Sequence, residues 1–329
     1  MSLAKFKHSL KESMISLAWM QWTALGVAGQ TETTKSRIID PEALLLFTTY
    51  IGREDQRLFD LTLDWLQING RFINTQRLKT MLKRTSFESS SVLGYMAASL
   101  SSFEARAKWS KLAETLVPKV KPKLTPLFNN TPLSTAQKRD PQALRYGFER
   151  NIYIPTNKAL AFSTESLATL LLRFRGFLGV SARCEVLLTL LCNDFCTIQE
   201  TANSSGYSWR SIQDILFEMN KSGYIGANEA KRGRYYFLKN REERLKSLDL
   251  RNALTLTFPN WLSVYNACIS LLIALQNPRL SRVSPLSIQG VVESVFTKIG
   301  PTLMECGMEE LRFISADNYK GLPQILEQL

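Results

Sequence analysis

The sequence contains a single histidine among its 329 residues, His8, near the start of the chain. Because one histidine in this position cannot complete a histidine-based catalytic triad or a three-histidine metal site, those kinds of site are excluded. The chain also lacks the glycine-rich phosphate loops Gly-x-x-x-x-Gly-Lys and Gly-x-Gly-x-x-Gly. We therefore expect no enzyme activity, no catalytic residue, no cofactor and no bound metal.

Cysteine is scarce and irregularly spaced. The five cysteines are Cys184, Cys192, Cys196, Cys268 and Cys306. An odd number without regular spacing does not make a disulfide framework, so we expect reduced, buried thiols in a cytoplasmic protein. Cys192 and Cys196 lie close in sequence, but no second ligand pair follows at a zinc-site spacing, and we interpret both as small buried hydrophobic residues.

Long hydrophobic runs are also missing. Residues 252–278 are uncharged, yet their apolar part, 261–275, is only fifteen residues long. A membrane-spanning helix needs roughly 20 mostly apolar residues, so we expect a buried core helix here. No secretory signal is apparent at the start of the chain, and no membrane partner is expected.

Positive charge, in contrast, is in surplus. Forty-one Lys and Arg face twenty-nine Asp and Glu, which gives a formal net charge of +12. This balance favours polyanions as partners. The chain is long enough for two or three domains, and its 45% apolar content supports well-buried cores.

Hydrophobic periodicity and proline content divide the chain into four parts. Residues 1–117 are predicted to form an α-helical N-terminal domain, with helices over 4–28, 42–51, 56–68, 74–84 and 92–116. Residues 118–141 hold five of the twelve prolines and are expected to form an extended linker. Residues 142–240 are expected to form a second domain, and 241–329 a helical region for packing or dimerisation.

One helix of the N-terminal domain is strongly basic. Arg71, Arg77, Lys79, Lys83 and Arg84 fall on or beside the predicted helix 74–84, which follows a glycine turn. Two interpretations remain open. The segment is either part of a second helix-turn-helix-like unit that contacts nucleic acid, or a solvated basic surface, which is the commoner case.

The segment 183–239 has the strongest local pattern. Thr197-Ile-Gln-Glu200 has the form of a capping box and predicts a short helix that ends at 204–207. Ser208 is expected to cap the next helix, and Gly223 to end it in the left-handed conformation. The buried face of this second helix is predicted to contain Ile212, Ile215, Leu216 and Met219. Two short strands, Tyr224-Ile225 and Tyr235-Tyr236-Phe237-Leu238, are expected around a basic turn.

This order of elements resembles the winged helix-turn-helix transcriptional regulators, including the MarR-like and ArsR-like groups. The resemblance implies a mainly α fold with a small β-wing, and it makes 142–240 a winged-helix DNA-binding domain. A homodimer on double-stranded DNA is then expected, with the recognition helix 208–222 in the major groove. The DNA-binding residues implied are Ser208, Trp209, Arg210 and Gln213 on that helix, and Lys231, Arg232 and Arg234 at the wing.

The charge of the module itself weakens this interpretation. Residues 183–239 contain seven Lys and Arg against six Asp and Glu. DNA-binding domains usually show a clearer surplus. The alternative is a non-catalytic interaction subunit of a larger assembly, in which the same module docks on a protein. No pocket for a small-molecule effector is readable from the sequence.

Overall fold

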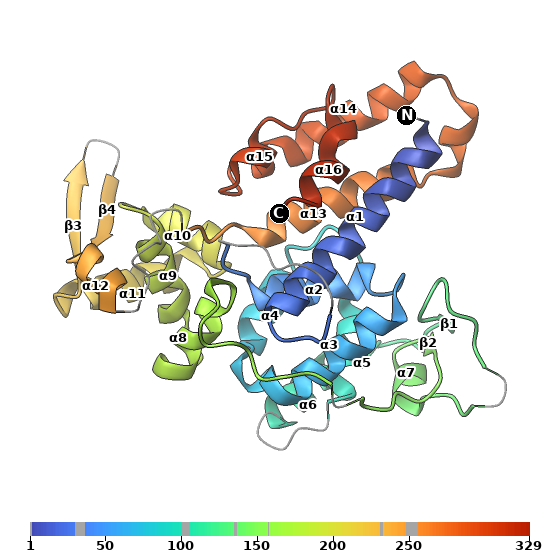
Figure 1. The fold of residues 1–329 in the computed structure, drawn as a ribbon, viewed down its shortest axis with the longest axis horizontal. Helices are drawn as coiled ribbons and strands as arrows, with labels where there is room; N and C mark the ends of the chain where they lie inside the picture. Colours follow the sequence, from blue (N-terminus) through green and yellow to red (C-terminus); the bar gives the residue numbers. More distant parts are fainter. Residues whose placement is uncertain are drawn as a thin grey trace. The chain divides into compact units, whose positions relative to one another are not determined.

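The computed structural model describes residues 2–29, 37–100, 106–134, 137–156, 158–230, 233–247 and 256–329. Over these residues the chain is mainly helical, with two small two-stranded sheets, which confirms the expected mainly α class (Figure 1). The chain forms two compact units. Unit 1 comprises Met1–Thr34, Pro41–Ser163 and Trp261–Leu329, and unit 2 comprises Lys35–Asp40 and Thr164–Asn260.

Unit 1 is built from helices of both ends of the chain. Its longer helices are α1 (Leu3–Ala24), α2 (Pro41–Ile51), α3 (Gln56–Asn69), α4 (Thr75–Leu82), α5 (Ser90–Ala98), α6 (Arg106–Thr115), α13 (Trp261–Leu275) and α14 (Pro285–Met304). The shorter ones are η1 (Gly70–Phe72), α7 (Pro141–Arg145), η4 (Pro278–Arg282), α15 (Glu309–Arg312), η5 (Tyr319–Gly321) and α16 (Leu322–Leu326). Strands β1 (Thr125–Pro126) and β2 (Phe148–Glu149) pair in parallel.

Aromatic side chains dominate the core of unit 1. The indole rings of Trp22 on α1 and Trp65 on α3 meet edge to face, with centroids 5.1 Å apart. Both rings are fully buried, and each indole N–H has an acceptor. Trp22 donates to Thr48 Oγ1 at 2.8 Å and Trp65 donates to the Leu25 carbonyl at 2.6 Å. Burial therefore leaves neither indole donor unpaired.

The C-terminal helices pack on the N-terminal ones. Helix α13 lies against α1 and α2, and α16 lies against α1. Tyr265 on α13 stacks on Phe47 of α2 with centroids 4.2 Å apart, and Tyr319 meets Phe6 edge to face. The expected region 241–329 is thus divided between the units, because its apolar helices from Trp261 onward complete the core of unit 1.

The segment 118–141 also differs from the expected linker. Its described residues belong to unit 1, where Leu127 and Phe128 are buried. The segment is hydrogen bonded to its neighbours through Thr125 N, which donates to the Gly147 carbonyl, and Asn129 N, which donates to the Arg53 carbonyl. Proline keeps the segment extended, but two buried apolar side chains fix it against the helices.

The exposed surface of α4 carries fewer basic side chains than the sequence of this helix predicts. Arg77 is fully buried, and its Nη1 lies 2.6 Å from Glu42 Oε2 on α2. Arg71, Lys83 and Arg84 are exposed. The buried pair joins α4 to α2, so one of the five predicted basic residues serves packing rather than a nucleic-acid surface.

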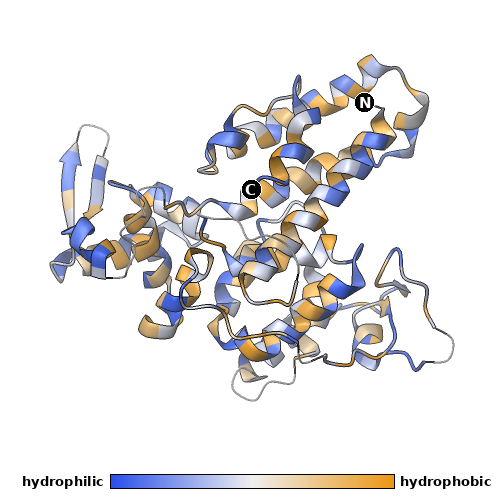
Figure 2. Cartoon of the chain, in the orientation of Figure 1, coloured by the Kyte–Doolittle hydropathy of each residue, from blue (hydrophilic) through white to orange (hydrophobic). Residues whose placement is uncertain are grey.

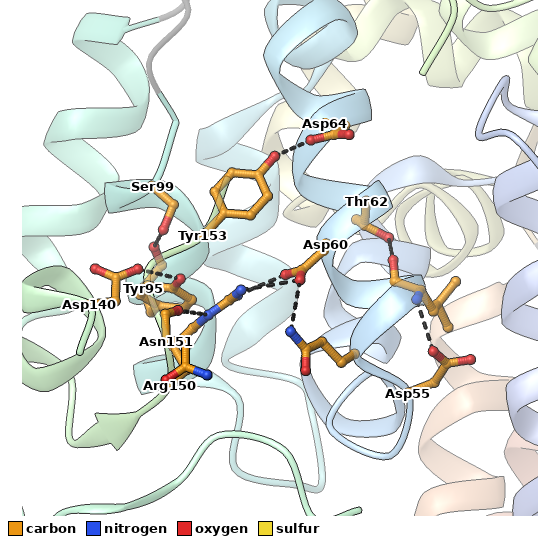
Figure 3. A network of polar contacts seen from close by, with 12 residues as sticks. Asp55, Asp60, Thr62, Asp64, Tyr95, Ser99, Asp140, Arg150, Asn151 and Tyr153 are labelled. Atoms are coloured by element: carbon orange, nitrogen blue, oxygen red, sulfur yellow. Dashed lines mark hydrogen bonds and ion pairs between the residues drawn. The ribbon is translucent and has the colours of Figure 1, made fainter. Parts of the chain in front are cut away.

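A polar network connects α3 with the segment that follows β2 (Figure 3). Arg150 forms two bonds to Asp60, 2.8 Å from Nη1 to Oδ1 and 3.1 Å from Nη2 to Oδ2, and its guanidinium lies over the Tyr95 ring. Tyr153 donates its hydroxyl to Asp64. Burial raises the pKa of Asp60 although Arg150 opposes the shift, and burial together with Asp64 raises the pKa of Tyr153. The network holds 150–156 on α3.

Unit 2 contains η2 (Leu167–Thr169), α8 (Leu170–Leu178), α9 (Ala182–Cys192), α10 (Ile198–Ser205), α11 (Trp209–Lys221), β3 (Ile225–Ala230), β4 (Gly233–Leu238) and α12 (Arg241–Ser247). Most of α9 is hydrophobic, and it lies at the centre of the unit's core, where it packs against α8, α10, α11 and β4 (Figure 2). The short segment 37–40 joins this unit through Ile38 N, which donates to the Thr257 carbonyl, and Ile39 N, which donates to the Ala168 carbonyl.

A buried ion pair ties α8 to α9. Arg175 Nη2 contacts Glu185 Oε1, and both side chains are fully buried. A second Arg–Glu pair in the unit, Arg183 with Glu218, is more than half exposed. Both pairs join an arginine to a glutamate, but the first is buried and the second is exposed to solvent.

Among the described residues, no helix combines the length and the apolar composition that crossing a membrane requires.

Replacement of Glu185 by alanine is expected to lower the free energy of unfolding by about 3–5 kcal/mol, because Arg175 would stay buried without its carboxylate partner. The matched change Glu218→Ala removes an exposed partner and should cost at most about 1 kcal/mol. Urea denaturation followed by circular dichroism measures both. Equal losses for the two variants would contradict the assigned difference between buried and exposed pairs.

Glu54, in the turn after α2, supports a pH-dependent prediction. Burial alone would raise the pKa of Glu54, but donors from Asn129, Lys11 and Asn130 outweigh it and hold the pKa below its ordinary value. Lys11 Nζ lies 3.0 Å from Glu54 Oε2 and Asn129 Nδ2 lies 2.5 Å from Oε1. A carboxyl group with a lowered pKa stabilises the fold above its unfolded pKa, and this contribution disappears as the pH falls through the folded pKa.

Glu54→Gln is therefore expected to lower the free energy of unfolding by about 1–3 kcal/mol near neutral pH. The difference from the unchanged protein should shrink as the pH falls below the ordinary range of glutamate. Urea titrations at a series of pH values measure it, with the exposed Glu114→Gln on α6 as the control at neutral pH. A difference that is constant with pH would contradict the role given to the carboxylate.

Candidate nucleic-acid interface

Helix α10 begins at the predicted capping box. Thr197 Oγ1 accepts from Glu200 N at 3.1 Å, and Glu200 Oε2 accepts from Thr197 N at 2.7 Å. Two backbone donors that a helix start leaves free are thus satisfied reciprocally. The helix ends at Gly206, whose φ of 77° is left-handed and whose N–H donates to the Ala202 carbonyl. Both ends of this short helix are fixed by local sequence.

The turn after α10 leads directly into α11. Ser208 is the N-cap, and its Oγ accepts from Ser211 N at 3.2 Å. The helix runs to Lys221, and Gly223 follows with a φ of 76°. The predicted caps at Ser208 and Gly223 are both confirmed. Because α10 and α11 are capped on either side of a three-residue turn, the start of α11 is held at a fixed point of the unit.

Helix α11 has a buried face and an exposed face. Ile212 and Leu216 are fully buried, and Ile215 and Met219 are half-buried against the same core. The four predicted core positions are therefore all on the inner side. The four contact residues predicted at this helix, Ser208, Trp209, Arg210 and Gln213, are all exposed.

Two aromatic side chains stand on the exposed face. Trp209 is 47% exposed and Phe217 is 57% exposed, and Gln213 lies midway between them at a spacing of one helical turn. Aromatic residues are enriched at protein interfaces relative to the rest of the surface. The face also carries acids, because Asp214 and Glu218 are exposed.

Strands β3 and β4 form an antiparallel hairpin after α11. The register pairs Ile225 with Leu238 at the base and Ala230 with Gly233 at the tip. Tyr236 and Leu238 point into the core. The hairpin gains a further backbone pairing at Cys196, just before α10, whose N–H donates to the Tyr236 carbonyl at 3.0 Å.

Of the three basic residues predicted at the wing, the structure describes one. Arg234 is exposed, and its guanidinium lies 5.7 Å from the centroid of the Tyr236 ring. Lys231 and Arg232, the other two predicted contacts, lie outside the described residues. The structure thus places five of the seven predicted residues at exposed positions: three on α11, Ser208 at its N-cap and Arg234 on β4.

An aromatic pair between exposed Phe195 and half-buried Phe237 of β4 was not predicted from the sequence. Phe195 is 56% exposed and meets Phe237 edge to face at 5.8 Å. Phe237 lies across the sheet from Gly226, where an added Cβ would lie 2.2 Å from the ring. The signal that the sequence offered for this arrangement was Gly226, because a glycine opposite an aromatic residue leaves room for the ring to lie across the sheet.

The described part of the chain contains no group of three or more His, Cys, Asp or Glu placed to hold a metal ion. The five cysteines are free thiols, four of them buried. Burial raises the pKa of Cys192 to about 12 and that of Cys196 to about 11, so both thiols stay protonated. The carboxylates that converge in unit 1, Asp60, Asp64 and Asp140, each accept side-chain donors.

Thr197→Ala is expected to destabilise unit 2 by about 1 kcal/mol, because the Glu200 N–H would lose its acceptor at the start of α10. Thr197→Ser keeps the hydroxyl and should be close to neutral. Thermal unfolding of the two variants beside the unchanged protein measures the effect. The assignment of the cap fails if both variants lose the same stability.

Comparison of the chain with models of known protein families, with characterised proteins and with solved structures found no match.

Proposed function

We propose that unit 2 is a winged helix-turn-helix that binds double-stranded DNA. In this proposal α10 and α11 are the helix-turn-helix, α11 is the recognition helix, and the β3–β4 hairpin is the wing. Support comes from the order of the elements, from the turn fixed between two capped helices, and from the isolated antiparallel bridge between Cys196 and Tyr236, which ties the start of α10 to the hairpin.

The observation that carries the proposal is the exposed N-terminal half of α11. Trp209, Arg210 and Gln213 all stand clear of the core there, although Ile212 between them is fully buried. The N-terminal residues of a recognition helix are those that contact base edges. Arginine pairs with guanine through two hydrogen bonds, and glutamine pairs with adenine in the same way.

The hairpin supplies the second contact. Arg234 is exposed on β4, and Lys231 and Arg232 come shortly before it in the sequence. Basic side chains at this position contact phosphates or enter the adjacent minor groove. Unit 2 as a whole has 15 Lys and Arg against 11 Asp and Glu, a larger surplus than the module 183–239 alone. We infer a cytoplasmic, non-catalytic regulator that acts as a homodimer.

The second candidate is a protein-docking module, and the exposed aromatic residues favour it. Trp209 and Phe217 are enriched types at protein interfaces, and Asp214 between them would repel phosphate. The same face would then bind an apolar groove of a partner protein. Salt dependence separates the two candidates, because only phosphate contacts release counterions from DNA.

The test is fluorescence anisotropy with a labelled duplex of random sequence, titrated from low to moderate salt. We expect affinity that falls steeply with salt, by a slope of about 0.9 per phosphate contact. Arg234→Ala should reduce that slope by about one and weaken all duplexes alike. Lys246→Ala, an exposed lysine of α12 in the same unit, is the control and should change neither.

A duplex selected for tight binding then tests α11. Arg210→Ala is expected to cost about 1–3 kcal/mol on the selected duplex and to relax the sequence preference at one position. No binding at low salt would reject the DNA proposal and leave the protein-docking candidate. Salt-dependent binding that neither variant changes would move the contact away from unit 2.

A further inference from the structure

A cavity of about 670 Å³ lies within unit 2, on the far end of α11 from the predicted base contacts. Its lining comes from α8, α9, the end of α11, β4 and α12. The deepest lining residues are Leu170, Phe174, Leu187, Leu191 and Leu238, which are all buried members of the unit's core. The floor of the cavity is therefore apolar.

The cavity opens to solvent beside the end of α8. Phe174, Phe177 and Leu178 follow Leu170 at helical spacing and line the same side of this helix. Phe177 is 86% exposed and Leu178 is 45% exposed. An apolar stripe thus continues from the buried floor to the open rim, which is the form of a site that takes an apolar body from solvent.

The charged residues that line the cavity are all arginines. Arg173, Arg183 and Arg244 contribute to its wall, and no Asp or Glu is found among the described residues that line it. Arg183 is already paired with Glu218. Arg244 lies over the Tyr224 ring, 3.6 Å from the centroid, and its Nε donates to the Lys239 carbonyl, so its two terminal nitrogens have no acceptor among the described residues.

Arg173 has even fewer partners. It forms no ion pair with any carboxylate of the described residues, although it stands one turn before Phe177 on the lining side of α8. Two guanidinium groups therefore border an apolar cavity without a carboxylate partner among the described residues. Guanidinium binds carboxylate through two parallel hydrogen bonds, and this pairing is stronger where apolar walls exclude water.

We propose that this cavity binds an amphipathic carboxylate, a molecule with an apolar body and one anionic head. The apolar body occupies the floor around Leu170 and Leu187, and the carboxylate pairs with Arg173 and Arg244. The volume lies within the roughly 300–1,000 Å³ typical of small-molecule sites. The charge of the wall selects an anion over a neutral or cationic molecule of the same shape. This inference does not depend on DNA binding.

The probe is decanoate, kept below the concentration at which it aggregates, and binding is measured by isothermal titration calorimetry on the full chain. Decylamine has a chain of the same length with the opposite charge. We expect saturable one-to-one binding of decanoate and at least tenfold weaker binding of decylamine. No saturable decanoate binding, or equal affinity for the two probes, would overturn the proposal.

Variants locate the site. Arg173→Gln is expected to weaken decanoate binding about tenfold or more, because it removes a charge-assisted hydrogen bond, whereas Arg173→Lys should keep much of the affinity. Phe177→Ser should weaken binding several-fold by removing apolar contact at the rim. Lys221→Gln changes an exposed cation of the same unit that does not line the cavity, so it is the control and should have no effect.

Thermal unfolding of each variant confirms that the fold is intact before affinities are compared. Decanoate binding that is unchanged in both Arg173→Gln and Phe177→Ser would place the ligand elsewhere and overturn the assignment. The same holds if analytical ultracentrifugation shows that the unchanged protein self-associates and that Phe177→Ser abolishes it, because a second copy would then cover the cavity.

Discussion

The buried pair of Arg175 and Glu185 is the constraint on which unit 2 depends. Neither charge can be left alone in an apolar core, so α8 and α9 must stay in register with each other. Helix α9 in turn contacts α10, α11 and β4. The ion pair thus fixes the helix that carries the apolar stripe of the cavity to the helix that supports the predicted DNA contacts.

Helix α11 connects the two candidate sites of the unit. Its N-terminal half carries Trp209, Arg210 and Gln213 on the exposed face, and Met219 near its other end lines the cavity. The two candidate sites therefore use side chains of the same helix, at its opposite ends.

The elements that local sequence determines were the ones that could be predicted. The capping box at Thr197, the N-cap at Ser208 and the left-handed Gly223 each depend on a few adjacent residues, and all three are confirmed. Features that depend on distant residues were not predictable. The fixed course of Leu127 and Phe128 and the burial of Arg77 by Glu42 depend on partners far along the chain. The cavity likewise combines α8 with α12, which no local pattern connects.

The division of the chain between the two units affects the order in which they can fold during synthesis. Residues 164–260 supply nearly all of unit 2. This unit can therefore form its internal contacts as soon as those residues have left the ribosome. Helices α1 and α2 precede unit 2 in the sequence, whereas α13, which packs on both, and α16, which packs on α1, follow it. The aromatic faces of Phe6 and Phe47 are therefore without Tyr319 and Tyr265 throughout the making of unit 2. Until α13 and α16 are made, this apolar surface of α1 and α2 stays uncovered on the nascent chain and is prone to aggregation.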